Sequence, residues 1–224
     1  MTGTARYDGI ADWYDTEFQP APLESETWET LVRLLEDAPG ALIDIGCGTG
    51  AYSAALAGLG WTVTGVDVSE DMLRRAAAKG VRTVHTDASA LPFEDGSFDA
   101  AISVFTHTDV DDFTNLVREV VRVLRPGSPF VYVGAHPCFV GPHSVYDVER
   151  KAPELHPDWY RKTGRYDEAP GIWRGSGVRI RVGASHLPLG LFLQTFLDAG
   201  LRLERIEEPA EREYSFALAS RWRR

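Results

Sequence analysis

The sequence predicts an α/β domain in which a Rossmann-like, mostly parallel sheet of seven strands carries helices on both faces. Between residues 41 and 133, short apolar runs alternate with helical segments. This alternation is typical of βαβ units and a parallel sheet. The first run, Ala41–Ile45, stops at Gly46, as a buried parallel strand does. Two further runs near the C-terminus predict an antiparallel pair that closes the sheet.

The remaining elements follow from periodicity and from turn residues. The further strands are expected at Thr62–Val66, Val81–His85, Phe98–Val104, Pro129–Val133, Leu201–Glu207 and Tyr214–Ala219. The helices between them are expected at Ala51–Leu59, Glu70–Lys79, Asp109–Leu124 and Leu187–Leu197. Residues 1–224 thus read as one domain with a helical cap at 1–40. Residues 135–185 interrupt the alternation of strands and helices and predict an inserted lid on the substrate side. Within this lid, Arg179–Val182 looks like a strand.

Composition and charge exclude several classes of protein. The chain has 224 residues, with 33 acidic and 23 basic side chains and a formal net charge of −10. This balance argues against nucleic-acid binding, and the cluster Arg221, Arg223 and Arg224 is expected to be a solvated tail. Two cysteines exclude a disulfide framework, and no apolar run is long enough to span a membrane. Without a signal peptide, a cytoplasmic location is expected, and nothing indicates an oligomeric state.

The richest local signal is the glycine turn that follows the first strand. Gly46, Gly48 and Ala51 satisfy the dinucleotide-binding pattern G-x-G-x-x-G/A, and Asp67 follows about 20 residues later. A nicotinamide-dependent oxidoreductase is therefore one alternative. Asp44 argues against it, because a carboxylate at the mouth of the turn repels a pyrophosphate and attracts an ammonium group.

Three acids are expected at the carboxyl ends of three adjacent strands. Asp44, Asp67 and Asp87 would then surround a crevice at the switch point of the sheet. Such a crevice suits a ligand with an amino-acid head, a ribose and an adenine ring. Asp67 would bind both ribose hydroxyls, and Asp87 would bind the adenine amino group.

Four successive motifs resemble those of class I S-adenosylmethionine-dependent methyltransferases. They are Asp44-Ile45-Gly46-Cys47-Gly48-Thr49-Gly50, Val66-Asp67-Val68-Ser69-Glu70-Asp71-Met72, Asp87-Ala88-Ser89-Ala90-Leu91-Pro92-Phe93 and Phe98-Asp99. The sequence is most similar to the small-molecule branch, which includes ubiquinone- and menaquinone-biosynthesis enzymes and natural-product methyltransferases. The resemblance covers roughly residues 7–133 and the terminal strand pair. It implies S-adenosylmethionine as cofactor and S-adenosylhomocysteine as product.

The resemblance implies a set of residues around the methionine part of the cofactor. Gly46, Cys47 and Gly48 would pass beneath it. Asp44 would hold its ammonium group. Tyr14, in a Tyr-Asp pattern that similar enzymes carry near the N-terminus, would cover it.

The same resemblance implies contacts along the rest of the cofactor. Asp67 would bind the ribose, and Val68 and Met72 would pack on the adenine ring. Asp87, with the Ala88 backbone beside it, would bind the adenine amino group.

The chemistry is expected at the carboxyl end of the fourth strand. Val104 and Phe105 would lie near the methyl-donating end, so His107 is the first candidate for a general base and His136 the second. A loop histidine that caps the following helix is an equally good interpretation of His107. The histidine spacings match no zinc pattern, so no metal is expected.

The lid favours a small, hydrophobic or aromatic substrate. Its aromatic residues are Phe139, Tyr146, Trp159, Tyr160, Tyr166 and Trp173. They suit an apolar pocket, although they could equally form the core of the lid itself. We expect methyl transfer with oxygen as the favoured acceptor. Carbon or nitrogen transfer, a cyclase or rearrangement catalyst that binds the cofactor without transferring its methyl group, and a tRNA-modifying enzyme are the alternatives.

Overall fold

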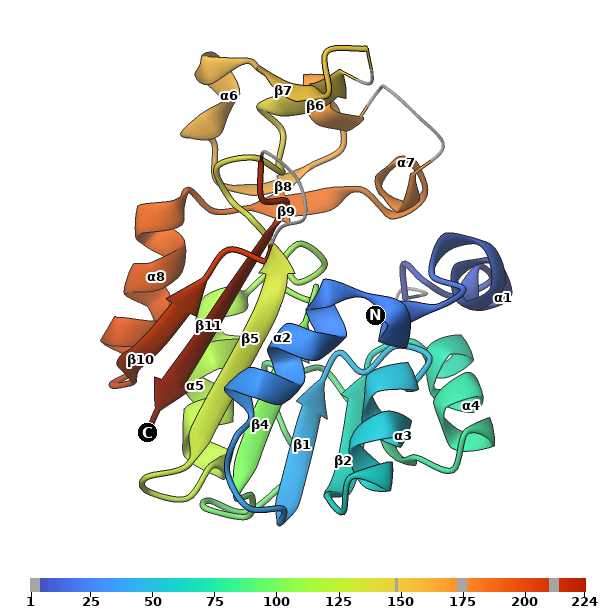
Figure 1. Cartoon of the computed structure of the whole chain (residues 1–224), viewed down its shortest axis with the longest axis vertical. Helices are drawn as coiled ribbons and strands as arrows, with labels where there is room; N and C mark the ends of the chain where they lie inside the picture. The colour runs from blue at the N-terminus through green and yellow to red at the C-terminus, as the bar shows by residue number, and fades with distance from the viewer. Residues whose placement is uncertain (1–4, 148, 173–176, 210–213) are drawn as a thin grey trace.

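A twisted seven-stranded sheet forms the centre of the molecule (Figure 1). The computed structural model describes residues 5–147, 149–172, 177–209 and 214–224. The strand order is β10-β11-β5-β4-β1-β2-β3, in which β11 runs antiparallel to both neighbours and the other pairs along β5-β4-β1-β2-β3 are parallel. The strands are β1 (Ala41–Ile45), β2 (Thr62–Asp67), β3 (Arg82–His85), β4 (Ala100–Val104), β5 (Pro129–Ala135), β10 (Arg202–Glu207) and β11 (Ala217–Arg223). The predicted fold class is confirmed.

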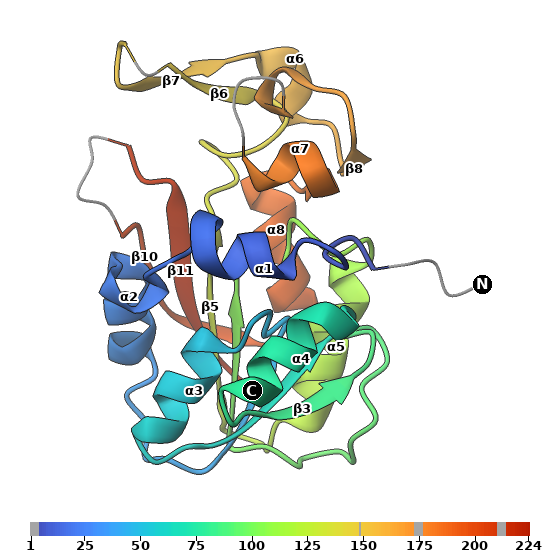
Figure 2. The same cartoon turned by 90° about the vertical axis from the view of Figure 1, so that its right-hand side faces the viewer.

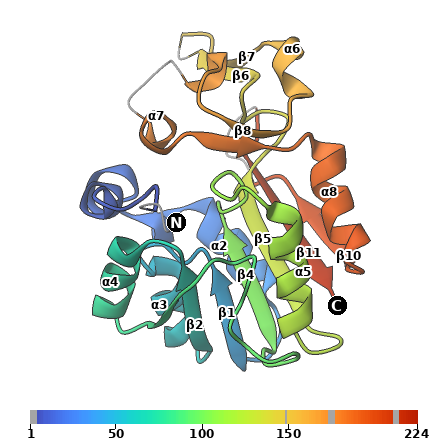
Figure 3. The same ribbon diagram turned by 180° about the vertical axis from the view of Figure 1, so that it is seen from behind.

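Each face of the sheet packs against its own helices (Figure 3). The helices are α2 (Glu26–Leu34), α3 (Ala51–Gly58), α4 (Glu70–Ala78), α5 (Phe113–Val123) and α8 (Leu189–Asp198). Alternate side chains of β1 point to opposite faces, as the pleat requires. Ile43 shares one apolar core with Phe113 of α5 and Phe192 of α8. Leu42 shares the other core with Leu31 of α2 and Leu56 of α3.

The helix starts show why the chain turns where it does. Ser69 caps α4 by accepting a hydrogen bond from the Met72 N–H. Asp112 caps α5 in the same way through the Asn115 N–H, at 2.9 Å. Helix α5 therefore begins at Phe113, four residues later than expected, and the preceding residues remain as a loop at the end of β4. This loop contributes to the site.

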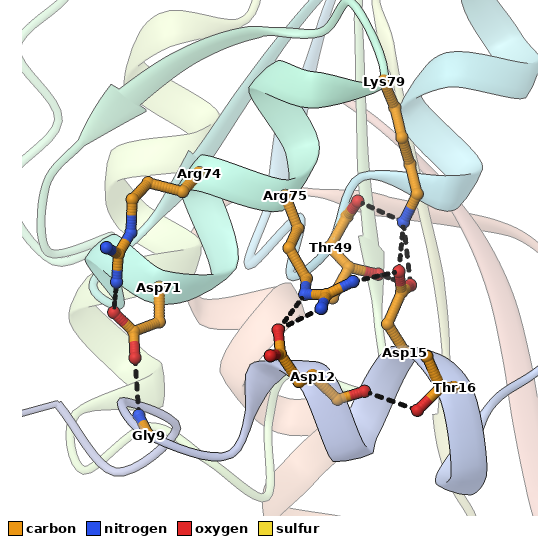
Figure 4. Close-up of polar contacts among 9 residues, drawn as sticks. All are labelled: Gly9, Asp12, Asp15, Thr16, Thr49, Asp71, Arg74, Arg75 and Lys79. Atoms are coloured by element: carbon orange, nitrogen blue, oxygen red, sulfur yellow. Dashed lines mark hydrogen bonds and ion pairs between the residues drawn. The ribbon is translucent and has the colours of Figure 1, made fainter.

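A short N-terminal cap packs on α4 (Figure 4). It consists of α1 (Ala11–Trp13), the π-helical turn η1 (Tyr14–Phe18) and the 3₁₀ turn η2 (Pro22–Glu24). Asp12 pairs with Arg75, and Asp15 accepts a 2.7 Å hydrogen bond from Lys79. These ion pairs hold the cap beside the glycine turn.

A separate layer, formed by the described residues of the range 143–186, lies above the carboxyl ends of the parallel strands (Figures 1 and 2). We call it the lid layer. Its elements are β6 (Ser144–Asp147), β7 (Ala152–Leu155), α6 (Pro157–Tyr160), β8 (Gly164–Tyr166), η3 (Pro170–Ile172), α7 (Val178–Val182) and β9 (Ala184–His186). Strands β6 and β7 form one antiparallel pair, and β8 and β9 form another.

The strand predicted at Arg179–Val182 is wrong, because these residues belong to the helical turn α7. The segment alternates charged and apolar residues, which is typical of a strand. The turn is instead fixed by long-range contacts, since Arg181 packs its guanidinium 4.0 Å from the Trp13 ring and Arg179 pairs with Asp109.

The predicted solvated tail is also wrong. Arg221 lies in β11 with a side chain that is 4% exposed, and it pairs with Asp37 and, at 2.9 Å, with Glu204. Arg223 pairs with the same two acids. The strand runs from Ala217 to Arg223 rather than ending at residue 219, so the basic cluster is part of the sheet.

No helix within the described ranges is both long enough and apolar enough to cross a membrane.

Candidate cofactor and active site

The glycine turn after β1 adopts a backbone that other residues rarely adopt. Gly46 and Gly48 have φ of 69° and 53°, in the left-handed region. A Cβ at Gly46 would come within 2.6 Å of the Thr106 hydroxyl oxygen, so this position has no room for a side chain. A Cβ at Gly48 would meet no atom within 4 Å. The backbone at Gly48 is therefore open to a ligand.

Asp67, at the end of β2, is tied to this turn. One carboxylate oxygen accepts a 2.9 Å hydrogen bond from the Gly48 N–H, and the other accepts one of 2.9 Å from Ser69. Burial raises the pKa of Asp67 above its usual value, although these backbone hydrogen bonds act in the opposite direction. The structure thus holds a desolvated carboxylate in a fixed orientation at the carboxyl end of β2.

Asp44, one strand away, is more deeply buried. Its side chain accepts a 2.6 Å hydrogen bond from the Ser53 hydroxyl, and the residue is 2% exposed. Burial raises the pKa of Asp44 to about 7, partly offset by the bond from Ser53, and the charge of Asp67 raises it further. Two poorly solvated carboxyl groups therefore lie side by side at the turn, which favours a cation.

A cavity of about 350 Å³ lies at the carboxyl ends of the strands. Its volume falls in the range of small-molecule sites. Ten of the twelve residues implied to contact the cofactor line it: Tyr14, Gly46, Gly48, Asp67, Val68, Met72, Asp87, Ala88, Val104 and Phe105. The other two, Asp44 and Cys47, line an adjoining cavity of about 40 Å³ that shares Tyr14, both glycines and Phe105 with the first. The structure therefore brings all twelve positions to two cavities that share part of their lining.

The two ends of the cavity differ in polarity. At one end, Asp87 accepts a 2.8 Å hydrogen bond from the Ser89 N–H, with Val68 and Met72 on the cavity wall. Val68 is 53% exposed, so an apolar edge is available to a planar ring. This end offers an acceptor beside an apolar surface, as an adenine amino group and ring require.

The opposite end is covered by two tyrosines of the N-terminal segment. Tyr7 and Tyr14 meet edge to face with ring centroids 5.6 Å apart. Desolvation raises the pKa of both phenols, so both are neutral at physiological pH. Phe105, which also lines the cavity, adopts φ of 56°, in the left-handed region that a non-glycine residue seldom occupies. The cover over this end is aromatic and uncharged.

His107 does not reach the cavity. Its Nδ1 hydrogen bonds to the Tyr132 hydroxyl, and its ring packs against Phe113 and Phe192. Desolvation, together with the charge of Arg179, lowers the pKa of His107 to about 3. The side chain is a neutral group in the aromatic core beneath the lid layer.

His136 has both ring nitrogens engaged. Its Nδ1 accepts a 3.1 Å hydrogen bond from the Cys138 N–H, so its proton lies on Nε2, which lies 2.7 Å from Glu208. The residue is 3% exposed and lines neither cavity. The structure thus separates both candidate bases from the cavity by their own hydrogen bonds.

Sequence reasoning missed a polar cluster at the lid side of the cavity. Asp109 lines the cavity and pairs with Arg179 of α7 at 2.5 Å, and it accepts a 3.1 Å hydrogen bond from the Tyr7 hydroxyl. Arg179 also donates a 2.7 Å hydrogen bond to the Thr108 hydroxyl. The residues lie about 70 positions apart, and no local pattern links them.

The aromatic lid residues are only partly described. Trp173 and the side chain of Tyr146 lie outside the described residues, so their predicted role is untested. Trp159 carries Lys162 over its ring at 3.4 Å, and Tyr160 packs against His143. These described aromatic groups contact other parts of the lid layer.

The residues present fit a ligand with a cationic amino-acid head, a ribose and an adenine ring. Asp44 and Asp67 remain incompletely compensated, and the glycine backbone leaves room beside them. A negatively charged pyrophosphate would lie against these same carboxyl groups. The donor set therefore suits S-adenosylmethionine better than a dinucleotide.

Comparison with known proteins agrees with this geometry. Residues 43–132 match a family model described as a methyltransferase domain. A segment is 41% identical over 97 residues to the demethylmenaquinone methyltransferase of Staphylococcus aureus (strain MRSA252) and covers 40% of each chain. The matched part thus spans well under half the length of that relative.

Solved structures extend the likeness to almost the whole chain. An S-adenosylmethionine-dependent methyltransferase from Mesorhizobium loti aligns with a TM-score of 0.74 and 26% identity, over 89% of this chain and 98% of that one. The [4+2]-cyclase SpnF aligns with a TM-score of 0.62 and 18% identity, over 88% and 79% respectively. The second likeness concerns the fold alone.

Residues 43–132 are thus a methyltransferase domain, and the fold of the chain is that of class I S-adenosylmethionine-dependent methyltransferases. S-adenosylmethionine is the cofactor of this class. The predicted class and cofactor are confirmed.

Proposed function

We propose that the protein transfers a methyl group from S-adenosylmethionine to a small, hydrophobic or aromatic metabolite, with oxygen as the acceptor atom. One observation carries the proposal: two desolvated carboxyl groups, Asp44 and Asp67, flank an open glycine backbone beside a cavity of about 350 Å³. A cationic, ribose-bearing ligand satisfies all three features.

In this proposal, the residues of the chain bind the cofactor and orient it. Asp67 is aimed at the ribose hydroxyls, and Asp44 supplies a negative charge for the ammonium group. The Tyr7 and Tyr14 rings exclude water from the end of the cavity next to Phe105. When bound, the cofactor supplies a methyl group already activated on a sulfonium sulfur. The main task of the protein is then to hold an acceptor in line with that methyl group. Such positioning lowers the activation free energy by roughly 7–11 kcal/mol in favourable cases.

The lid layer supports a small acceptor. It covers the carboxyl ends of the strands, and its Ser185 N–H donates a 2.7 Å hydrogen bond to the Thr108 carbonyl. A covered site favours a small molecule over an exposed position on a macromolecule. The partial likeness to a demethylmenaquinone methyltransferase is consistent with a quinone-type small-molecule acceptor.

The test is a product-mass assay. Purified protein is incubated with S-adenosylmethionine and a panel of aromatic hydroxyl, amine and unsubstituted quinol acceptors. A mass gain of one methyl group on a hydroxyl acceptor supports the proposal. Gain on carbon or nitrogen corrects the acceptor atom, and an isomerised product of unchanged mass indicates a cyclase or rearrangement catalyst.

Matched variants connect the assay to the cavity. Asp67→Asn keeps the size of the side chain but removes its charge, and we expect cofactor affinity to fall roughly 10–100-fold, the effect of losing a charge-assisted hydrogen bond. Asp95→Asn is the control, because Asp95 is 78% exposed and pairs with Arg122 outside the cavity. Equal affinity of the two variants would contradict the assigned ribose site.

A further inference from the structure

The guanidinium of Arg179, on the lid-layer turn α7, pairs with Asp109, which lines the cofactor cavity. Its side chain is 25% exposed, and desolvation is the largest influence on its pKa. The charge and hydrogen bond of Asp109, together with the electrostatic effects of Tyr7 and Tyr166, outweigh desolvation, so the pKa of Arg179 lies above its usual value. Arg179 is therefore permanently charged in a poorly solvated position, where hydrogen bonds to it are strengthened.

The hydrogen bonds that orient Arg179 leave some N–H donors of its guanidinium available. Nη1 donates to Asp109 at 2.5 Å, and Nη2 donates to Thr108 at 2.7 Å. A guanidinium has five N–H groups, and its hydrogen bonds to the described residues use two of them. Asp109 is itself occupied, because the same oxygen accepts from the Tyr7 hydroxyl at 3.1 Å. The ion pair thus orients the guanidinium without using all its donors.

The groups around Arg179 are phenols and other hydroxyls rather than further bases. Tyr7, Tyr14 and Tyr166 lie near enough for the charge of Arg179 to lower their pKa values, although burial keeps all three neutral. Tyr166 lies in β8 of the lid layer, where desolvation raises its pKa to about 12. Neutral hydroxyl groups beside a fixed cation suit an oxygen-bearing ligand.

The carboxylate on the lid side of the cavity, Asp109, is already paired, because its Oδ1 accepts hydrogen bonds from Arg179 and from the Tyr7 hydroxyl. None of the six histidines, all of which lie within the described part of the chain, lines either cavity. A neutral hydroxyl acceptor would need a base to become a good nucleophile. An acceptor that binds already ionised would not.

We propose that Arg179 is a specificity-determining residue that binds an anionic oxygen of the acceptor, which selects acidic hydroxyl compounds such as phenols and enols. This inference rests on the proposed function and names the substrate class of the same site. Asp109 and Thr108 act as positioning residues that hold the guanidinium at the junction of α7 with the β4–α5 loop.

The chemistry balances without a base. The anionic oxygen supplies the electron pair of the new carbon–oxygen bond, and the sulfonium sulfur keeps the pair of the carbon–sulfur bond that breaks. The acceptor loses its negative charge and the donor its positive charge, so no proton leaves. Arg179 lowers the pKa of the acceptor hydroxyl and thus raises the fraction that is ionised at neutral pH.

The test measures binding of two matched probes to protein saturated with S-adenosylhomocysteine. The first probe is 2-hydroxy-1,4-naphthoquinone, whose acidic hydroxyl gives a coloured anion. The second is its methyl ether, 2-methoxy-1,4-naphthoquinone, which cannot ionise. We expect the anion to bind at least tenfold more tightly than the ether, with the pKa of the bound hydroxyl lowered, as absorbance at varied pH reports.

Two variants of the ion pair give effects of opposite sign. Arg179→Met leaves the Asp109 carboxylate alone, and the preference for the anion should disappear. Asp109→Asn leaves the guanidinium uncompensated, and the preference should be kept or increased. Arg181→Met is the matched control on the same helical turn, because Arg181 contacts the Trp13 ring and not Asp109. The double variant Arg179→Met/Asp109→Asn removes both charges and should lose the preference without leaving an unpaired carboxylate.

The outcomes separate the two proposals. If the wild type binds S-adenosylhomocysteine but shows no preference for the anion, or binds neither naphthoquinone, Arg179 does not select the acceptor. The same holds if Arg179→Met and Asp109→Asn change the preference in the same direction, since a purely structural ion pair predicts that result. Failure of the wild type to bind S-adenosylhomocysteine would overturn the proposed function itself.

Discussion

The rim of the sheet, at the carboxyl ends of β1, β2 and β3 with Asp44, Asp67 and Asp87, lines the two cavities, and it holds its polar groups differently from the lid layer above it. In the rim, acids accept hydrogen bonds from backbone N–H groups that follow closely in the sequence. Asp67 accepts one from Ser69, and Asp87 accepts one from Ser89. In the lid layer, the pair between Arg179 and Asp109 joins side chains 70 residues apart. The rim is therefore set by local geometry, whereas the lid side depends on docking of a separate layer.

This difference predicts which substitutions affect the whole fold and which affect only ligand binding. The largest loss of stability should come from the sheet. Arg221→Met removes a buried cation that bonds the Leu34 carbonyl and pairs with Asp37 and Glu204. We expect the free energy of unfolding to fall by about 3 kcal/mol, because Asp37 loses its stronger partner, Glu204 loses one of its partners and the Leu34 carbonyl loses its donor.

Urea denaturation measures this change. Arg202→Met is the control, since Arg202 is 70% exposed and also pairs with Glu204. It should change the free energy of unfolding by less than about 0.5 kcal/mol. Equal losses in the two variants would show that burial of Arg221 does not set its contribution.

A smaller effect, of opposite sign, is expected at the rim. The pKa of Asp44 is raised to about 7, so the folded state favours its neutral form. The stability that this gives is complete below about pH 3.8 and is lost as the pH rises through 7. Asp44→Asn should therefore raise the free energy of unfolding at pH 8 by on the order of 2 kcal/mol, while weakening S-adenosylhomocysteine binding.

Denaturation of the ligand-free protein at pH 4 and pH 8 checks the sign, with calorimetry for binding. The stabilisation should vanish at pH 4, where Asp44 is neutral in the folded wild type. A variant that is less stable than the wild type at pH 8 would contradict the account of Asp44.

The lid layer should respond to acid. His143 and His186 lie with ring centroids 5.2 Å apart, and desolvation lowers the pKa of both, that of His186 to about 4. Their folded pKa values lie below the unfolded value, so the stability they give is present above about pH 6.5 and lost as the pH falls towards 4. Local opening of the lid layer should become easier by on the order of 1–2 kcal/mol over this range.

Hydrogen exchange compares the two regions directly. Amides of β9 should lose protection between pH 7 and pH 4, after correction for intrinsic exchange, while those of β5 should not. His186→Gln should reduce the difference. Equal loss in both strands would mean that the sheet and the lid layer open together.

The smallest effect is expected at the N-terminal cap. Asp12 is 88% exposed in its pair with Arg75, whereas Asp15 is 18% exposed and pairs with Lys79. Asp12→Ala should change the free energy of unfolding by less than about 0.5 kcal/mol, and Asp15→Ala by more. The reverse order in urea denaturation would contradict the ranking by exposure.

The rim could be predicted from the sequence because its signals are local. The strand Ala41–Ile45 was predicted with its observed bounds, and the glycine turn and three acids follow from spacing alone. Asp67 meets Gly48 because both lie at the carboxyl ends of adjacent parallel strands, β1 and β2.

The lid side could not be predicted in the same way. The turn α7 was predicted as a strand because its contacts, Trp13 and Asp109, lie far away in sequence. The same limit applies to His107, whose place at the end of β4 suggested a catalytic role. Its burial against Tyr132 and Phe192 depends on β5 and α8, which no local pattern reveals.

The central claim is that the rim of the sheet binds S-adenosylmethionine. Isothermal titration calorimetry of the wild type with S-adenosylhomocysteine, and separately with NAD, tests it most directly. The account predicts one molecule of S-adenosylhomocysteine bound per chain and no heat from NAD, because Asp44 and Asp67 favour a cationic head over a pyrophosphate. Binding of NAD without binding of S-adenosylhomocysteine would contradict it.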